Sequence, residues 1–189
     1  MKQGSPNGVP MRIAVIGTSG AGKTTLARVI ASVLEIPHVE LDGLHWGANW
    51  TEKPESELRA SLDQATGQEA WVCDGNYGMV RDLIWPRADT LVWLDYSFAR
   101  VFLQAFRRTV CRAWRKEELF SGNRESWRQS FASRDSILWW VIRTWRRRRR
   151  ELGTLLARPE YSHLRIHRFG HPREAQRWLA TLANRVPGV

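Results

Sequence analysis

The sequence predicts an α/β fold, a parallel β-sheet covered by helices, and three observations lead to this prediction. Short apolar runs typical of buried strands alternate along the chain with segments of helical periodicity. Strands that alternate with helices pair in parallel through right-handed crossovers. The 189 residues show no internal repeat and no low-complexity linker, so residues 11–189 are expected to form one domain after a disordered leader at 1–10.

The predicted strands are short runs rich in Val, Ile, Leu and Trp. The first, RIAVIG, ends in glycine, the third ends in Asp74–Gly75, and the fourth ends in Asp95. In chain order the strands are predicted over 12–17, 37–42, 70–75, 89–95 and 163–169.

The predicted helices carry apolar residues at helical spacing. Such residues recur from Leu26 to Leu34, and Ile137, Val141 and Trp145 repeat every four residues. A polar loop containing glycine, at 118–127, separates two long helices. In chain order the helices are predicted over 23–35, 53–67, from about 97 to 114, over about 130–156 and over 172–185.

The positive charge of the chain is concentrated in one segment. The formal net charge is +10, and residues 107–150 contain 14 Lys and Arg against 4 Asp and Glu, which accounts for all of it. The two cysteines lack metal-ligand spacing and favour a reducing compartment, so a cytoplasmic protein is expected. No run approaches the 18 apolar residues of a membrane span.

Residues 17–24, GTSGAGKT, match the phosphate-binding pattern G-x-x-x-x-G-K-[ST] between a predicted strand and a predicted helix. Glycines let successive backbone N–H groups converge on phosphate oxygens, and the helix adds its positive end. Lys23 is expected to reach the β- and γ-phosphates of ATP, and the Thr24 hydroxyl to bind Mg²⁺. The predicted nucleotide-binding residues are Gly17, Thr18, Ser19, Gly20, Ala21, Gly22, Lys23, Thr24 and Thr25.

Acidic residues lie at the carboxyl ends of the second and third predicted strands, at the sheet edge where ligands bind in open α/β sheets. Asp42 is the first candidate to orient Mg²⁺ or accept a proton from a substrate hydroxyl, with a helix cap as its structural alternative. Asp74 is a second candidate for the metal, and a structural role is favoured for Asp95. The predicted acceptor-binding residues, which could instead pack or cap helices, are Asp42, His45, Trp46, Asn76, Tyr77 and Arg81.

Two groups of arginines carry the excess charge. Arg108, Arg112 and Arg115 share one helix face and Arg124 lies beside Gly122, which predicts a lid at 107–126, although a solvated basic face is the alternative. Five consecutive arginines at 146–150 surround a helix and cannot all face one ligand. Most are expected to be solvated or paired with acids, and nucleic acid is a compatible partner for this segment.

With these motifs in this order, the sequence resembles the small P-loop kinases related to adenylate, shikimate and gluconate kinases. It is most similar to the bacterial adenylate-kinase-like proteins labelled "DNA topology modulation" proteins, which share LD-x-L-x-W at 41–46 and DGNY at 74–77. The resemblance implies a P-loop NTPase three-layer sandwich: a five-stranded parallel sheet, helices on both faces and an Arg-rich helical lid, with ATP and Mg²⁺ bound. GNYG stands where adenylate kinases have G-[FY]-P-R, which argues against AMP as the acceptor.

The sequence therefore predicts a kinase that transfers a phosphoryl group from Mg-ATP to a nucleotide-like or hydroxylated small molecule. No guanine-reading N-K-x-D is visible, which argues against a GTPase. The alternative is a nucleotide-regulated nucleic-acid-binding protein that uses the basic helix at 143–150. The catalytic candidates are Lys23, Asp42, Arg108, Arg112 and Arg124, and the metal candidates are Thr24 and Asp42.

Overall fold

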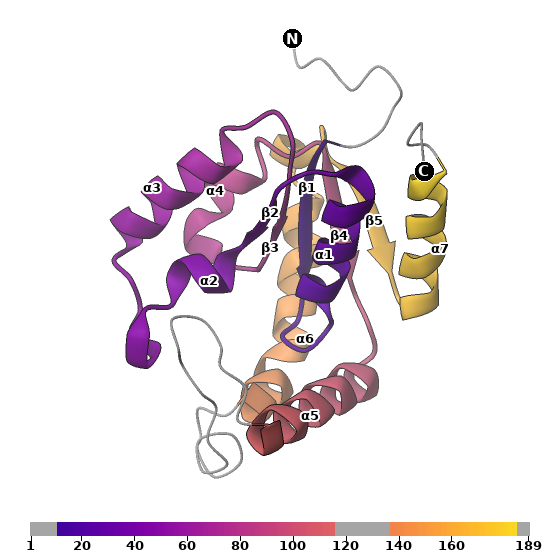
Figure 1. The fold of residues 1–189 in the computed structure, drawn as a ribbon. Helices are drawn as coiled ribbons and strands as arrows, with labels where there is room; N and C mark the ends of the chain where they lie inside the picture. The colour runs from indigo at the N-terminus through magenta and orange to yellow at the C-terminus, as the bar shows by residue number, and fades with distance from the viewer. Residues whose placement is uncertain (1–10, 116–136, 185–189) are drawn as a thin grey trace.

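Five parallel strands form a single sheet in the order β2-β3-β1-β4-β5 (Figure 1). The structure, a computed structural model, describes residues 11–115 and 137–184. The strands are β1 (Arg12–Gly17), β2 (His38–Glu40), β3 (Trp71–Asp74), β4 (Thr90–Leu94) and β5 (Arg165–Phe169). The helices are α1 (Lys23–Leu34), α2 (Leu41–His45), α3 (Glu55–Thr66), α4 (Arg81–Ile84), α5 (Phe98–Arg115), α6 (Ile137–Leu156) and α7 (Pro172–Ala183).

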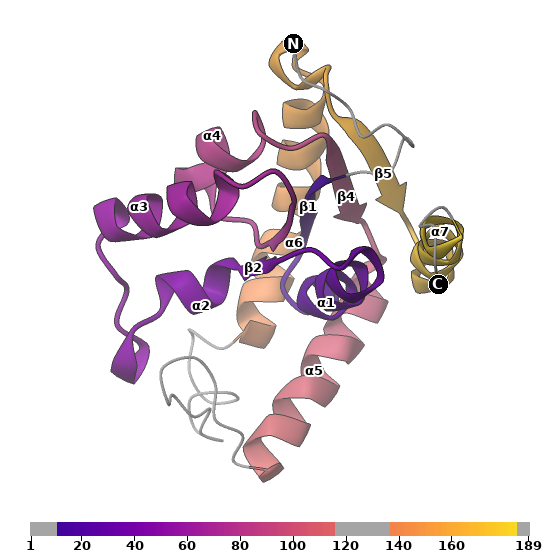
Figure 2. The same ribbon diagram turned by 45° about the horizontal axis from the view of Figure 1, so that its top comes forward.

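Alternate side chains of β1, β3 and β4 enter two different apolar cores. Ile13 and Val15 of β1 pack with α1, α5 and α7, whereas Ala14 and Ile16 pack with α3, α4 and the end of α6. Helices therefore cover both faces of the sheet, as the two views show (Figures 1 and 2). This is the P-loop NTPase fold that the sequence predicts.

The sheet order places β1 between β3 and β4, and the strands run in the same direction. The chain after β1 crosses to one side of it to form β2 and β3, and later strands lie on the other side. The carboxyl edge beside β1 is therefore the point where the strand order reverses, which is where open α/β sheets bind ligands.

The predicted strand at 37–42 is shorter than expected. Strand β2 ends at Glu40, and Leu41 begins helix α2, so Asp42 lies in the first turn of a helix. The short helices α2 and α4, and the 3₁₀ turn Ala48–Trp50, were not predicted. The leader at 1–10 and lid residues 116–126 lie outside the described residues. No described helix has the length and apolarity needed to cross a bilayer.

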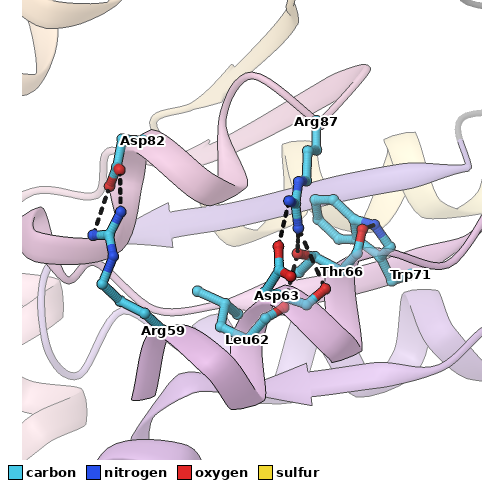
Figure 3. A network of polar contacts seen from close by, with 7 residues as sticks. All are labelled: Arg59, Leu62, Asp63, Thr66, Trp71, Asp82 and Arg87. Atoms are coloured by element: carbon cyan, nitrogen blue, oxygen red, sulfur yellow. Dashed lines mark hydrogen bonds and ion pairs between the residues drawn. The ribbon is translucent and has the colours of Figure 1, made fainter. Parts of the chain in front are cut away.

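A polar network joins α3 to the segment that follows β3 (Figure 3). Arg59 of α3 forms an ion pair with Asp82 and donates to the Met79 carbonyl oxygen at 2.6 Å. Arg87 pairs with Asp63 at 2.5 Å and donates to the Thr66 hydroxyl at 2.8 Å. These contacts fix the residues directly after Tyr77 against α3.

Thr66 is the buried member of this network, and its hydroxyl both accepts from Arg87 and donates to the Leu62 carbonyl oxygen at 2.8 Å. We expect Thr66→Val to lower the free energy of unfolding by about 1 kcal/mol, because valine keeps the shape but removes a buried hydrogen-bonding group. The measurement is the urea midpoint. Thr181→Val, on an exposed helix face, is the matched control and is expected to change stability by less than about 0.5 kcal/mol. Equal effects of the two substitutions would contradict the prediction.

Candidate active site

The loop between β1 and α1 has the backbone shape that presents amides to an anion. Gly22, the residue before α1, has a φ of 88°, and no described side chain caps the helix start. Gly20 has a φ of 86°, and a Cβ there would lie 2.8 Å from the Cβ of Ala105 on α5. Both positions therefore require glycine. Uncapped N–H groups at a helix start and the helix dipole together favour a bound phosphate.

The other predicted loop residues surround these amides. Thr18 is buried and Ser19 half-buried, and the Ala21 amide donates to the Thr18 carbonyl oxygen at 3.0 Å, which closes the turn. Thr25 is exposed on the first turn of α1.

Lys23 lies at the centre of the charged groups of the site. Its Nζ is 3.5 Å from the Thr18 carbonyl oxygen. Burial lowers the pKa of Lys23, and Asp42 and Asp74 oppose this shift, whereas Arg108 and Arg148 add to it. The ammonium group is therefore held in a partly desolvated position among both cations and carboxylates. A phosphate placed there would gain a strong charge-assisted contact.

The Thr24 hydroxyl donates to Oδ2 of Asp74 at 2.7 Å. Asp74 ends β3 and its side chain is 3% exposed. The opposite oxygen, Oδ1, is 2.7 Å from Nε2 of His38 on β2. The structure thus brings Thr24 together with Asp74, the second of the two candidate carboxylates. A hydroxyl and a carboxylate oxygen at this distance are hard donors of the kind Mg²⁺ takes in proteins.

Asp42 occupies a different place, on the exposed first turn of α2. The Tyr77 hydroxyl donates to its Oδ1 at 2.7 Å. Burial and the nearby Asp42 raise the pKa of Tyr77, so the hydroxyl keeps its proton at neutral pH. The charge of Asp42 still acts on Lys23, which places this carboxylate beside the loop. Its position suits contact with a second substrate better than contact with Thr24.

The remaining predicted acceptor residues gather next to Asp42. His45 is buried, and its ring centroid lies 4.7 Å from those of both Trp46 and Tyr77. Its Nδ1 has no hydrogen-bond partner among the described residues. Trp46 also contacts the ring of Trp50, with centroids 5.8 Å apart. The cluster forms an aromatic surface with a carboxylate at its edge.

Asn76 and Arg81 flank this cluster in the segment after β3. Asn76 is half-buried, and the guanidinium of Arg81 lies 4.9 Å from the ring centroid of Trp85. Arg81 also acts electrostatically on Arg148, so the two cations approach the site from different elements.

The lid prediction is only partly covered by the structure. Arg107 is exposed and Arg108 half-buried near the end of α5. The side chain of Arg112 and the whole of Arg124 lie outside the described residues. Of the predicted lid arginines, Arg108 is therefore the one whose charge the structure relates to Lys23.

The five consecutive arginines at 146–150 of α6 have different surroundings. Arg149 binds the buried Asp95 at 2.9 Å, as does Arg168 of β5 at 2.5 Å, so Asp95 has the structural contacts expected of it. Arg148 is half-buried, and its pKa is lowered, mainly by burial. Its charge acts on Lys23 and is influenced by Tyr77 and Arg81. Sequence reasoning singled out neither Arg148 nor His38, although the two-residue period of a strand puts His38 on the same face as Glu40.

Lys23→Met is expected to stabilise the ligand-free protein by about 1 kcal/mol at pH 7, a size typical of substitutions that relieve functional strain. The pKa of Lys23 is lowered in the folded state, so its charge opposes folding wherever the group is protonated. The gain should shrink as the pH rises from the folded-state pKa toward the ordinary value of 10.5.

Urea unfolding between pH 7 and pH 10 measures the gain in stability and its dependence on pH. The same measurement with Mg-ATP reports on nucleotide binding. Mg-ATP should raise the free energy of unfolding of the wild type and leave that of Lys23→Met unchanged. The control is Lys53→Met, which removes a lysine that pairs with Glu57 at 3.1 Å on α3. A Lys23→Met protein less stable than the wild type at pH 7 would disprove the prediction.

Comparison with known proteins extends the fold assignment. The family model described as "ATPase family associated with various cellular activities (AAA)" matches residues 13–73, from β1 to β3. The chain is similar in structure to shikimate kinase from Bacteroides thetaiotaomicron, with a TM-score of 0.52 and 18% identity over 92% of this chain and 98% of that one. It is also similar to shikimate kinase from Acinetobacter baumannii in complex with shikimate, with a TM-score of 0.56 and 15% identity over 94% of this chain and 96% of that one. A putative kinase from Chloroflexus aurantiacus has a TM-score of 0.52 and 15% identity over 94% of this chain and 99% of that one. No curated protein matches the sequence. The chain has the fold of these P-loop proteins.

Proposed function

We propose that this chain is an ATP-dependent kinase that transfers the γ-phosphoryl group to a hydroxylated small molecule. The observation that carries the proposal is the pair Thr24–Asp74 near the half-buried Lys23, with Asp42 and an aromatic cluster on the adjoining side. The fold that this chain shares with two shikimate kinases and a putative kinase supports the proposal.

In this proposal the loop amides from Gly17 to Thr25 and Lys23 hold the phosphates of ATP. Thr24 and Asp74 would hold Mg²⁺, which neutralises charge on the phosphate oxygens when bound. Thr24 and Asp74 would supply two ligand oxygens, which leaves the other coordination positions of the ion to nucleotide oxygens and water. Among the described residues no group of three acidic, His or Cys side chains could enclose an ion alone, which suits a metal that arrives with the nucleotide.

Asp42 would act on the acceptor. Tyr77 holds one carboxylate oxygen of Asp42. The other carboxylate oxygen would accept the proton of the acceptor hydroxyl while the hydroxyl oxygen bonds to the γ-phosphorus. The bond from the γ-phosphorus to the bridging oxygen breaks, and ADP leaves. Arg108 and Arg148, with Arg112 and Arg124 as lid candidates, would stabilise the charge that spreads over the transferring oxygens.

The aromatic cluster and the arginine beyond it would hold the rest of the acceptor. The His45 ring is inclined by 71° to that of Trp46 and by 51° to that of Tyr77, so the cluster would offer an angled aromatic wall, and Asn76 would offer an amide. Arg81 would pair with an anionic group if the acceptor carries one.

The proposal is tested by an ATP-consumption screen across small hydroxylated acceptors and nucleoside monophosphates. ADP release should rise with one acceptor class. In Asp42→Asn, kcat should fall by about 100-fold or more, the usual contribution of a general base, while the Kd for Mg-ATP stays within about twofold of the wild type. Glu57→Gln, an exposed carboxylate on α3, is the control and should retain kcat. Acceptor-independent ADP release, or an unchanged kcat in Asp42→Asn, would contradict it.

Nucleic-acid binding is a second candidate because the outer face of α6 keeps exposed cations. Arg143, Arg146, Arg147 and Arg150, which we call the basic stripe, are exposed, and Arg147 lies 3.5 Å from Glu151. Their helical spacing places them along one side of α6.

This candidate requires DNA binding tighter than about 1 µM at physiological salt and an effect of ATP on it. Replacing Arg143, Arg146 and Arg150 by Ala should then reduce the slope of log K against log salt concentration by about three, one phosphate contact for each arginine. Arg28→Ala, Arg173→Ala and Arg177→Ala combined, at exposed positions of α1 and α7, provide a control with the same charge change away from α6. Equal slopes for the two triple variants would exclude the basic stripe.

A further inference from the structure

His38 holds the buried carboxylate of Asp74 from the side opposite to Thr24. We infer that His38 is a positioning residue, which fixes Asp74 so that one carboxylate oxygen is directed toward Thr24 and a divalent cation. This inference rests on the proposed function, since it concerns the metal that accompanies the nucleotide.

Each oxygen of Asp74 has its own donor. Nε2 of His38 lies 2.7 Å from Oδ1, and the Thr24 hydroxyl lies 2.7 Å from Oδ2. The side chains of His38 and Asp74 are 16% and 3% exposed. An ionised carboxylate only accepts hydrogen bonds, so the ring donates its Nε2–H. With both oxygens engaged, the carboxylate cannot turn about its Cβ–Cγ bond without losing a hydrogen bond.

The pairing of β2 with β3 determines where the ring lies. His38 is opposite Val72 and Glu40 is opposite Asp74, so the histidine side chain reaches along the strands toward the carboxyl edge. Alternate residues of a strand share a face, and Glu40 forms an ion pair with Arg28 of α1 at 3.2 Å. The contact between His38 and Asp74 is therefore made on the sheet face covered by α1, which is the helix whose first turn contains Thr24.

Loss of the donor would leave Oδ1 as a buried acceptor without a partner and free the carboxylate to rotate. Groups that orient a metal ligand in this way typically contribute 10-fold to 100-fold to metal affinity. His38 lies on β2 with its ring engaged by Asp74, whereas the phosphate-binding amides belong to the loop between β1 and α1. Phosphate binding without metal should therefore not depend on His38.

Titration calorimetry with Mn²⁺, in the presence of the non-hydrolysable β,γ-imido analogue of ATP, tests the inference. The variants are His38→Gln, whose amide nitrogen can reach the place of Nε2, and His38→Asn, whose side chain is too short. We expect the Kd for Mn²⁺ to rise about 10-fold or more in His38→Asn and to stay within about threefold in His38→Gln. The affinity for the analogue in EDTA should be the same in all three proteins.

His163→Asn is the matched control, because that ring contacts the Trp85 carbonyl oxygen at 3.1 Å before β5, at the opposite edge of the sheet. Its Kd for Mn²⁺ should equal that of the wild type. If His38→Asn does not fold, His38→Ser makes the same comparison with an even shorter side chain.

Wild-type Mn²⁺ affinity in His38→Asn, or an equal loss in His38→Gln and His38→Asn, would overturn the positioning role and leave the proposed kinase function intact. A wild-type protein that binds neither the analogue nor Mn²⁺ would overturn both. The two failures are therefore distinguishable before any variant is made.

Discussion

The candidate site depends on one hydrogen bond, from the Thr24 hydroxyl to the Asp74 carboxylate, because it joins the start of α1 to the end of β3. Parallel pairing makes this contact possible. Val15 of β1 lies opposite Asp74, and the chain leaves β1 two residues later to form the phosphate-binding loop. The loop and the carboxylate thus meet at one edge, and each of the other charged groups is arranged around that meeting point.

The sequence predicted β1, the loop and α1 to within one residue, because strand pattern, glycine spacing and helical periodicity agree there. Helix α2 was missed since Leu41–His45 is too short to show a helical period and contains Gly43. The choice between Asp42 and Asp74 could not be made from sequence, because both lie at the carboxyl ends of predicted strands. Sheet order separates them: β3 lies next to β1 and β2 does not. Local residue patterns carry no information on which strand lies next to β1 in the sheet.

The ligand-free site holds Lys23 at a cost in free energy. Burial is the main cause that lowers the pKa of Lys23, Asp42 and Asp74 offset this effect in part, and Arg108 of α5 and Arg148 of α6 add to it. Bringing like charges together destabilises a fold, and proteins retain such arrangements where a ligand compensates for them. The arginines that distinguish this chain by composition thus divide between three uses: the site, a buried anchor at Asp95 and the solvent.

The anchor at Asp95 sets the rotation of α6 about its own axis. With Arg149 fixed there, Arg148 is turned by about 100° toward the loop. Because the neighbours of both residues are also arginines, a shift of the helix by one position would still present a guanidinium to Asp95 and another to the loop. The repetition makes the ionic contacts tolerant of small insertions or deletions in the chain upstream. Packing of Val141 and Trp145 would not share that tolerance, since no identical residue stands next to either.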